Sequence, residues 1–263
     1  MNLTRILTLV RRTFLVTFRG SDPLIDFFYW PLYDIMIWGF TSAWIVKETQ
    51  NHQLALTILA SLVLWQAVYR TNLDISFNFL AELWSRNIVN LFVTPLTAGE
   101  WMAASMITGA LNAWVALGFG SLAVWALYGI SIISIGWIFP LLAVMLFFSG
   151  WSLGLFTSSL LVTWGGSVQK FVWVMGWFFV PFVGIFYPVE SMPWWAQSVA
   201  YSLPMTYFFN VLQHYIVEGV FLKKIFVIGT CLSAFYFITA TLFFLFLFQA
   251  SRKRGLARLE TFQ

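Results

Sequence analysis

The chain has 263 residues, of which 60% are hydrophobic, 20% aromatic and only 9% charged. A soluble domain carries about 25% charged residues, so this chain has too little charge to cover the surface of a water-soluble globule. Intrinsic disorder is also excluded, because a disordered chain combines low hydrophobicity with high net charge. The composition therefore predicts an all-α, polytopic membrane protein. It forms one integral domain over residues 1–263, without room for a separate soluble catalytic domain.

Residues 1–20 are too charged to span a bilayer. Apolar residues recur there at three- and four-residue steps, while Arg5, Arg12 and Arg19 lie seven residues apart on another face. This pattern predicts an amphipathic helix lying in the membrane surface, with its arginines toward headgroups or water. A basic tail that only orients the first span is the alternative.

Six apolar segments are candidates for membrane spans, since one helical span needs about 20 mostly apolar residues. They cover residues 27–46, 54–69, 101–128, 132–162, 171–187 and 225–248. Pro181 predicts a kink in the fifth segment. An even number of spans places both termini on one side of the membrane.

The basic residues divide unequally between the two sides of such a bundle. Three of them, Lys47, Lys223 and Lys224, lie opposite the termini. Eleven lie on the side of the termini: Arg5, Arg11, Arg12, Arg19, Arg70, Arg86, Lys170, Arg252, Lys253, Arg254 and Arg258. Because positive residues beside spans stay in the cytoplasm, both termini are predicted to be cytoplasmic. Read as membrane anchors, these residues do not predict a nucleic-acid partner.

The sequence contains no catalytic constellation and no metal site. A phosphate-binding loop is not recognised, because the stretch from Gly165 to Lys170 lacks the second glycine of that motif. Cys231 is the single cysteine, and no Cys/His metal spacing exists. His214 and Glu218 are four residues apart and could hold a metal or proton, but a surface helix pair is preferred. We therefore expect no catalytic residue, metal or cofactor on this chain.

The connection between the second and third spans carries a patterned polar segment. Glu82, Arg86 and Asn90 fall at four-residue spacing, which predicts one polar face of a short amphipathic helix. Thr94 precedes Pro95, which ends a helix because the residue before proline is pushed out of the α region. Region 80–98 could thus present polar residues to a cytoplasmic partner. An ordinary loop helix without a partner is the alternative.

Residues 188–218, on the outer side, are apolar and aromatic but interrupted. Pro188, Pro193 and Pro204 divide them into pieces too short to span. Irregular backbone at membrane depth is tolerated only where protein or a cavity surrounds it. The segment therefore predicts a re-entrant helical hairpin that dips into the outer leaflet, with Trp194 and Trp195 at the interface. A plain aromatic belt is the alternative.

Two ionisable residues lie at similar depth in the first two spans. Asp34 lies in the inner half of the first span, and Arg70 follows the apolar part of the second. An unpaired charge near mid-bilayer costs about 2.5–3.5 kcal/mol. Such a carboxylate must be paired, neutralised or hydrated, and an Asp34–Arg70 ion pair with a structural rather than a translocation role is one hypothesis.

Three stretches together resemble a known family. The sequence Phe186-Tyr-Pro-Val-Glu-Ser-Met-Pro-Trp-Trp-Ala-Gln, followed by Leu203-Pro-Met-Thr-Tyr, resembles the signature after the fifth span of ABC-2 type exporter permeases. Thr94-Pro-Leu-Thr-Ala-Gly-Glu100 resembles the family's segment between the second and third spans. Arg19-Gly-Ser-Asp-Pro23 resembles its entry to the first span. The likeness follows the chain in order and agrees with the six-span count.

The resemblance implies the type V exporter fold and a half-transporter. Two copies of the chain would form a pathway in the lipid bilayer, and two separate ATPase subunits would bring ATP and Mg²⁺ and bind from the cytoplasm. We expect a multi-pass protein of a prokaryotic cytoplasmic (inner) membrane. The amino-terminal helix and the implied ATPase-coupling residues would contact the ATPase; these are Glu82, Arg86, Asn90, Thr94, Pro95 and Glu100. The implied outer gate contains Tyr187, Pro188, Pro193, Trp194, Trp195 and Pro204.

Two departures from the family pattern affect the coupling detail and the substrate. His214 stands where relatives often have a basic residue, and the loop from Trp164 to Lys170 is glycine-rich where they often carry charges. The substrate class stays open among polysaccharides, lipid-linked glycans, drugs and other amphiphiles. Candidate wall residues of the pathway are Trp30, Trp38, Trp173 and Trp177.

Two other functions compete with the exporter. A secondary carrier or channel would work without an ATPase and usually has polar residues in several spans. An integral enzyme acting on lipid would need convergent acid, base or metal residues, which the sequence does not offer. Co-purification of an ATPase would separate the exporter from both.

Overall fold

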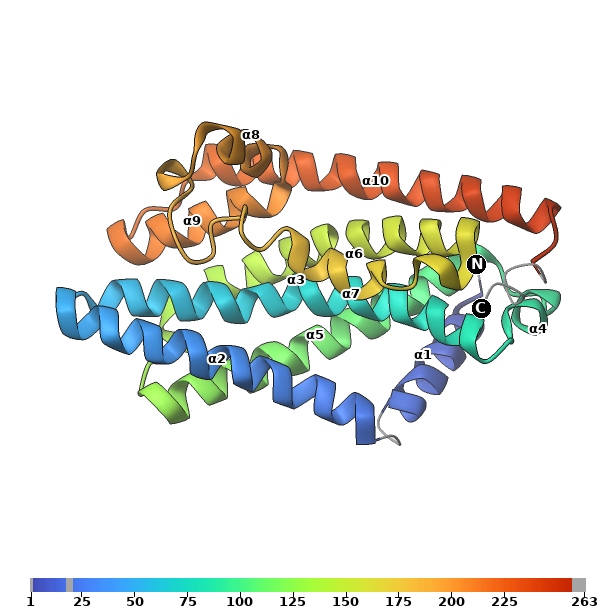
Figure 1. Ribbon diagram of the computed structural model, residues 1–263, viewed down its shortest axis with the longest axis horizontal. Helices are drawn as coiled ribbons and strands as arrows, with labels where there is room; N and C mark the ends of the chain where they lie inside the picture. The colour runs from blue at the N-terminus through green and yellow to red at the C-terminus, as the bar shows by residue number, and fades with distance from the viewer. Residues whose placement is uncertain (1, 18–20, 257–263) are drawn as a thin grey trace.

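The computed structural model describes residues 2–17 and 21–256, and within them all regular structure is helical. Long helices lie roughly side by side along the longest axis of the molecule (Figure 1). They are α2 (Ser21–Thr49), α3 (His52–Trp84), α5 (Ala98–Tyr128), α6 (Ile138–Trp164) and α10 (Lys223–Lys253). This arrangement agrees with the predicted all-α class.

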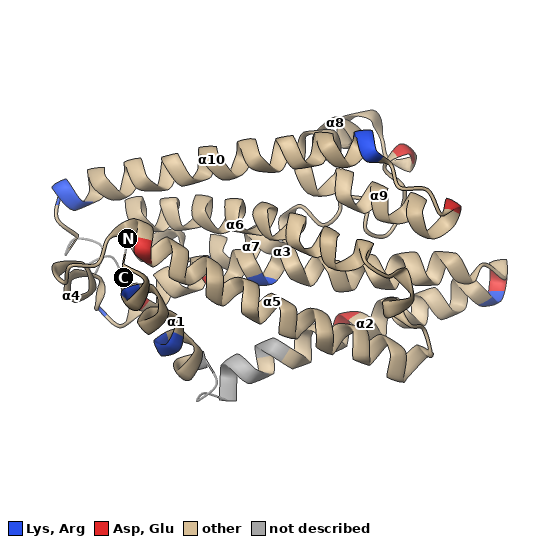
Figure 2. Cartoon of the chain, turned by 180° about the vertical axis from the view of Figure 1, so that it is seen from behind, with Lys and Arg blue, Asp and Glu red and all other residues tan. Residues whose placement is uncertain are grey.

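Four helical segments among the described residues are long and apolar enough to cross a membrane. They are His52–Trp84, Ala98–Tyr128, Ile138–Val168 and Lys223–Lys253. The protein is therefore a multi-pass membrane protein, while the count of six spans stays a prediction. Charged residues gather mainly at the two ends of the bundle, as expected when the middle of each helix faces lipid or protein (Figure 2).

α3 is the central helix, and it corrects the predicted second span of residues 54–69. It continues to Trp84, so Arg70, Asp74 and Glu82 lie on the same helix as the apolar part. No proline or glycine interrupts residues 70–84. Arg70 is only 3% exposed, because the helices around α3 cover its polar residues. The charged residues of this stretch are therefore covered by neighbouring helices, and they do not indicate the end of the span.

Two glycines of α6 allow it to pack closely against α3. A Cβ on Gly150 would overlap Thr71 Oγ1 and lie 2.6 Å from Val68 O. At Gly154, four residues further on, it would lie 2.9 Å from Asn72 O. Small residues at this spacing let helix backbones approach, which is the usual way that membrane helices associate.

The predicted fifth span, residues 171–187, is wrong as a continuous helix. The helix α7 covers only Phe171–Phe178, and turns follow it to Tyr187. Pro181 has no backbone N–H to continue the helix, and Gly184 has a φ of +78°, which is outside the α region. The break is thus an end of the helix rather than the kink that was expected.

Residues 188–218, predicted to lie on the outer side, contain two helices, α8 (Trp194–Ser202) and α9 (Pro204–Glu218). They lie at the end of the bundle opposite α1 (Leu3–Thr17) and α4 (Ile88–Val93), with α9 beside the start of α10 (Figure 1). Pro204 occupies the first turn of α9, where its missing N–H is tolerated. The two-helix arrangement is observed, and its insertion into a leaflet stays a prediction.

Candidate functional site

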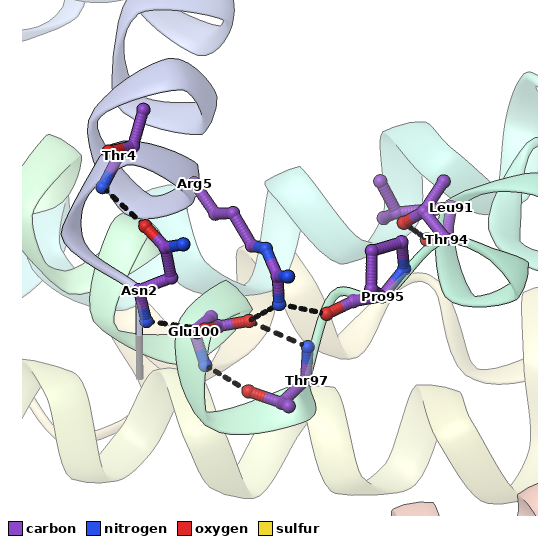
Figure 3. A network of polar contacts seen from close by, with 8 residues as sticks. All are labelled: Asn2, Thr4, Arg5, Leu91, Thr94, Pro95, Thr97 and Glu100. Atoms are coloured by element: carbon purple, nitrogen blue, oxygen red, sulfur yellow. Dashed lines mark hydrogen bonds and ion pairs between the residues drawn. The ribbon is translucent and has the colours of Figure 1, made fainter.

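Glu100, in the first turn of α5, is the centre of a polar network that holds the start of α1 (Figure 3). Its Oε1 accepts a hydrogen bond from the backbone N–H of Asn2 at 2.7 Å. Its Oε2 lies 3.6 Å from Arg5 Nη1, and Arg5 also donates to the carbonyl oxygen of Pro95. The Glu100 side chain is only 2% exposed. All of these partners are donors or a cation, so the site is built for a carboxylate.

The local sequence explains why Glu100 is positioned this way. Thr97 is the N-cap of α5, and its Oγ1 accepts from the Glu100 N–H at 3.2 Å. The Glu100 carboxylate accepts from the Thr97 N–H at 3.0 Å in return. This is the capping box Thr-x-x-Glu, which fixes both side chains at the start of a helix. One carboxylate therefore caps α5 and anchors α1 at the same time.

A second contact attaches the middle of α1 to the end of α3. Arg12 Nη1 lies 2.7 Å from Glu82 Oε1. Asn87 Nδ2 donates to Glu82 Oε2 at 2.6 Å, from the turn that follows α3. Glu82 therefore connects α1, α3 and the turn before α4. Arg19, predicted on the same face as Arg12, lies outside the described residues.

The predicted amphipathic helix through Glu82, Arg86 and Asn90 is wrong. Glu82 belongs to the last turn of α3, and Asn90 belongs to the separate helix α4. Arg86 lies between them with a φ of +51°, a left-handed conformation that ends a helix. The three residues therefore do not share one helix face, although Arg86 and Asn90 are both exposed.

The short helix α4 is packed on one side and open on the other. Ile88 and Phe92 are buried, and the Phe92 ring lies 4.6 Å from that of Phe248 on α10. The opposite surface exposes Asn90, Val93, Thr94 and Pro95, with Val93 79% exposed. We call these four residues the α4 surface. The Pro95 carbonyl, which Arg5 binds, joins this surface to the Glu100 network.

Three of the four predicted wall tryptophans line one cleft of about 430 Å³, which we call the aromatic cleft. It lies between α2, α3 and α7, and its lining residues are Trp30, Tyr33, Asp34, Tyr69, Leu73, Trp173 and Trp177. Trp38 is not among them. It stacks on Phe186 instead, with ring centroids 3.7 Å apart.

A second cleft of about 360 Å³, lined by more polar residues, opens between α1, α3 and α5, and we call it the polar cleft. Asp74 lies in it, accepting a 2.8 Å hydrogen bond from Asn112 Nδ2 on α5. Leu73 and Trp173 line both clefts, so the two adjoin. Arg12, Arg70 and Glu82 are also part of its wall.

The predicted Asp34–Arg70 ion pair is not formed. Among the described residues, ion pairs join Arg5 to Glu100 and Arg12 to Glu82 only. Asp34 lines the aromatic cleft, whereas Arg70 lines the polar cleft and lies 5.9 Å from the ring of Tyr69. Similar depth along two helices therefore did not bring the two side chains face to face.

The predicted outer-gate residues lie in α8, in the first turn of α9 and in the turns that precede α8. Tyr187 donates its hydroxyl to the Pro181 carbonyl at 2.8 Å, which closes the turns after α7. Trp194 is 80% exposed, and Trp195 meets Phe182 edge to face at 6.2 Å. Pro188 and Pro193 bound the short turn η3 (Val189–Ser191). The Nδ1 atom of His214 lies 3.0 Å from the carbonyl oxygen of Asn210.

Several hydrogen bonds of this site, those of three asparagines, were not predicted from the sequence. Asn2, Asn87 and Asn112 were not singled out, because a lone asparagine gives no sequence signal for a distant partner. The capping box at Thr97 and Glu100 was readable from the spacing alone. In the part of the chain that the structure describes, no three His, Cys, Asp or Glu side chains gather as metal ligands would.

Comparison with known proteins supplies the family. The family model described as ABC-2 type transporter matches residues 4–217. Among curated proteins none matches the sequence. The matched region contains α4, both clefts and the Glu100 network apart from Asn2, and it covers more than half of the chain. The chain therefore belongs to the ABC-2 type transporter family.

Proposed function

We propose that the chain is the membrane-spanning permease subunit of an ATP-driven exporter. Two copies would form the pathway, and ATP and Mg²⁺ would bind to two separate ATPase subunits on the cytoplasmic side. The family match is the observation that carries this proposal. A permease without its own nucleotide site must take its driving force from a partner that prefers one of its conformations.

The α4 surface is the part of the chain best suited to meet an ATPase. It is exposed, while Ile88 and Phe92 hold the helix firmly on its other side. A displacement of α4 would reach α1 and α5 through the Pro95 carbonyl, Arg5 and Glu100. We assign ATPase coupling to this surface and to the Glu100 network, with both termini cytoplasmic.

The remaining assignments follow from this orientation. α1 leaves Leu7, Leu15 and Val16 exposed, which supports a position in the membrane surface. The α8–α9 segment, at the opposite end of the bundle, would form the outer gate. An amphiphilic, glycan, lipid-linked or drug-like substrate would pass from the cytoplasmic end of the bundle, where α1 lies, to the outer gate.

Affinity purification of the tagged chain from its native membrane tests the proposal. We expect a protein with ATPase activity to co-purify, and we expect Val93→Asp on the α4 surface to abolish this association and ATP-dependent transport. Val220→Asp is the matched control, because Val220 is 48% exposed at the opposite end of the bundle and should leave both unchanged.

Transport by the purified chain without any ATPase would contradict the proposal. It would favour the secondary carrier or channel instead. Association that survives Val93→Asp while Val220→Asp abolishes it would place the ATPase at the wrong end of the bundle.

A further inference from the structure

Among its described lining residues, the aromatic cleft combines one carboxyl group with five aromatic side chains. Asp34 lies among Trp30, Tyr33, Tyr69, Trp173 and Trp177. The Trp30 and Tyr33 rings meet at 85° with centroids 6.1 Å apart, and those of Tyr69 and Trp177 lie 5.5 Å apart. The faces of such rings carry negative partial charge and attract cations.

Asp34 has no counter-ion in the part of the chain that the structure describes. Its Oδ2 is buried and has no hydrogen-bond partner there. The guanidinium that was expected to pair with it, that of Arg70, lines the neighbouring cleft. A charged carboxyl group in apolar surroundings lowers stability, and a bound cation would offset that cost.

We propose that the aromatic cleft binds a lipophilic organic cation, such as an amphiphile with an ammonium group. Asp34 is the counter-ion, and the rings of Trp30, Trp173 and Trp177 form the walls around the cationic centre. The volume of about 430 Å³ is that of a site for a drug-sized ligand. This inference rests on the proposed function, because it names the substrate class of the same pathway.

The lining residues favour a cation over the other substrate classes. Among the residues that the structure describes, neither lysine nor arginine lines the aromatic cleft, and Asp34 repels an anionic ligand. A neutral glycan could stack on the same rings and donate hydroxyl hydrogen bonds to Asp34, but it would leave the negative charge of the carboxylate uncompensated. Removal of the carboxyl charge therefore separates the cation from the glycan.

Equilibrium dialysis of radiolabelled tetraphenylphosphonium tests this inference. The full-length chain is placed in phosphatidylcholine nanodiscs, and binding to empty nanodiscs is subtracted. Tetraphenylborate is a probe of nearly the same shape with the opposite charge. We expect saturable binding of the cation and none of the anion. Asp34→Asn should weaken the binding of the cation by about tenfold or more.

Two tryptophans of α2 give a matched pair of variants. Trp30 lines the aromatic cleft, whereas Trp44 is 62% exposed on the same helix and does not. Trp30→Leu should weaken the binding of the cation several-fold, and Trp44→Leu should leave it unchanged. Glu190→Gln, which removes a distant carboxylate, should also leave it unchanged.

Three results would overturn the cation site. They are unchanged binding in a folded Asp34→Asn variant, equal binding of tetraphenylborate, and equal losses in the Trp30 and Trp44 variants. If Asp34→Asn does not fold, the two probes and the tryptophan pair still decide. If the cation does not bind but an ATPase still co-purifies, only the cation site is overturned and the proposed function stands. If the cation binds but no ATPase co-purifies, only the proposed function is overturned.

Discussion

Arg12 Nη1 and Glu82 Oε1 lie 2.7 Å apart and join the amino-terminal helix to the end of the central helix. The Arg12 side chain is 45% exposed and that of Glu82 12% exposed. Glu82 also accepts a hydrogen bond from Asn87, so its carboxylate keeps one partner if Arg12 is removed. The pair therefore locates α1 on the bundle more than it stabilises the fold.

A double-mutant cycle measures this pair. Arg12→Ala, Glu82→Ala and the double variant should give a coupling free energy of about 0.5–1 kcal/mol in thermal unfolding, because partly exposed ion pairs are weak. Glu82→Ala should cost more than Arg12→Ala, since it also leaves Asn87 without its acceptor. Equal effects of the two single variants would contradict the geometry.

Glu100 should control the attachment of α1. In Glu100→Gln the side chain that contacts Arg5 loses its negative charge, which weakens the attachment of α1. Amide hydrogens of residues 3–17 should therefore exchange faster in hydrogen–deuterium exchange. Thr97→Ala removes the N-cap of α5 and should cost about 1 kcal/mol of stability. The control is Glu48→Gln, at the other end of the bundle, which should leave exchange in α1 unchanged. Protection of α1 that survives Glu100→Gln would show that the network does not hold it.

Asp34 and Arg70 should behave independently. The double variant Asp34→Arg/Arg70→Asp should not rescue either single variant, because the two side chains line different clefts. Without ligand, Asp34→Asn should raise stability by about 1 kcal/mol, since it removes the charge of a carboxyl group whose buried Oδ2 lacks a hydrogen-bond partner. Thermal unfolding in the same detergent compares the variants, and rescue by the charge swap would restore the ion-pair interpretation.

The close contact of α3 and α6 predicts opposite effects at two helical glycines. Gly150→Ala should destabilise the protein by about 1–3 kcal/mol, because the added Cβ would overlap Thr71. Gly118→Ala should be neutral or stabilise it by up to about 1 kcal/mol, since nothing lies within 4 Å of the added Cβ. Thermal midpoints of the two variants check the prediction, and a stable Gly150→Ala would mean that α3 and α6 lie further apart.

Composition and hydropathy predicted the long helices well but not the ends of all of them. α5 begins three residues before the predicted 101 and ends at Tyr128 as expected, because Gly129 adopts a left-handed conformation. α3 was predicted too short, since Arg70 and Asp74 resemble the end of a span. Their burial depends on α5, whose Asn112 binds Asp74, and such a distant partner leaves no local pattern.

The site was predicted in part for a similar reason. Trp30, Trp173 and Trp177 come together, and Trp38 does not. Sequence position gives the depth of a residue along its helix but not the rotation of that helix about its axis. This is why Asp34 and Arg70 were wrongly paired. The capping box at Thr97 and Glu100, by contrast, depends only on local spacing and was within reach of prediction, but it was not among the features predicted from the sequence.

The attachment of α1 has a consequence for biosynthesis. Asn2 and Arg5 bind partners 98 and 90 residues further along the chain, at Glu100 and Pro95. Because α1 precedes α2, α3 and α5 in the chain, it cannot reach its final place until α2 and α3 have been translated and the start of α5 has emerged. Until then Arg5 has no partner in that network, so α1 can attach to the bundle only after the helices that follow it have been made.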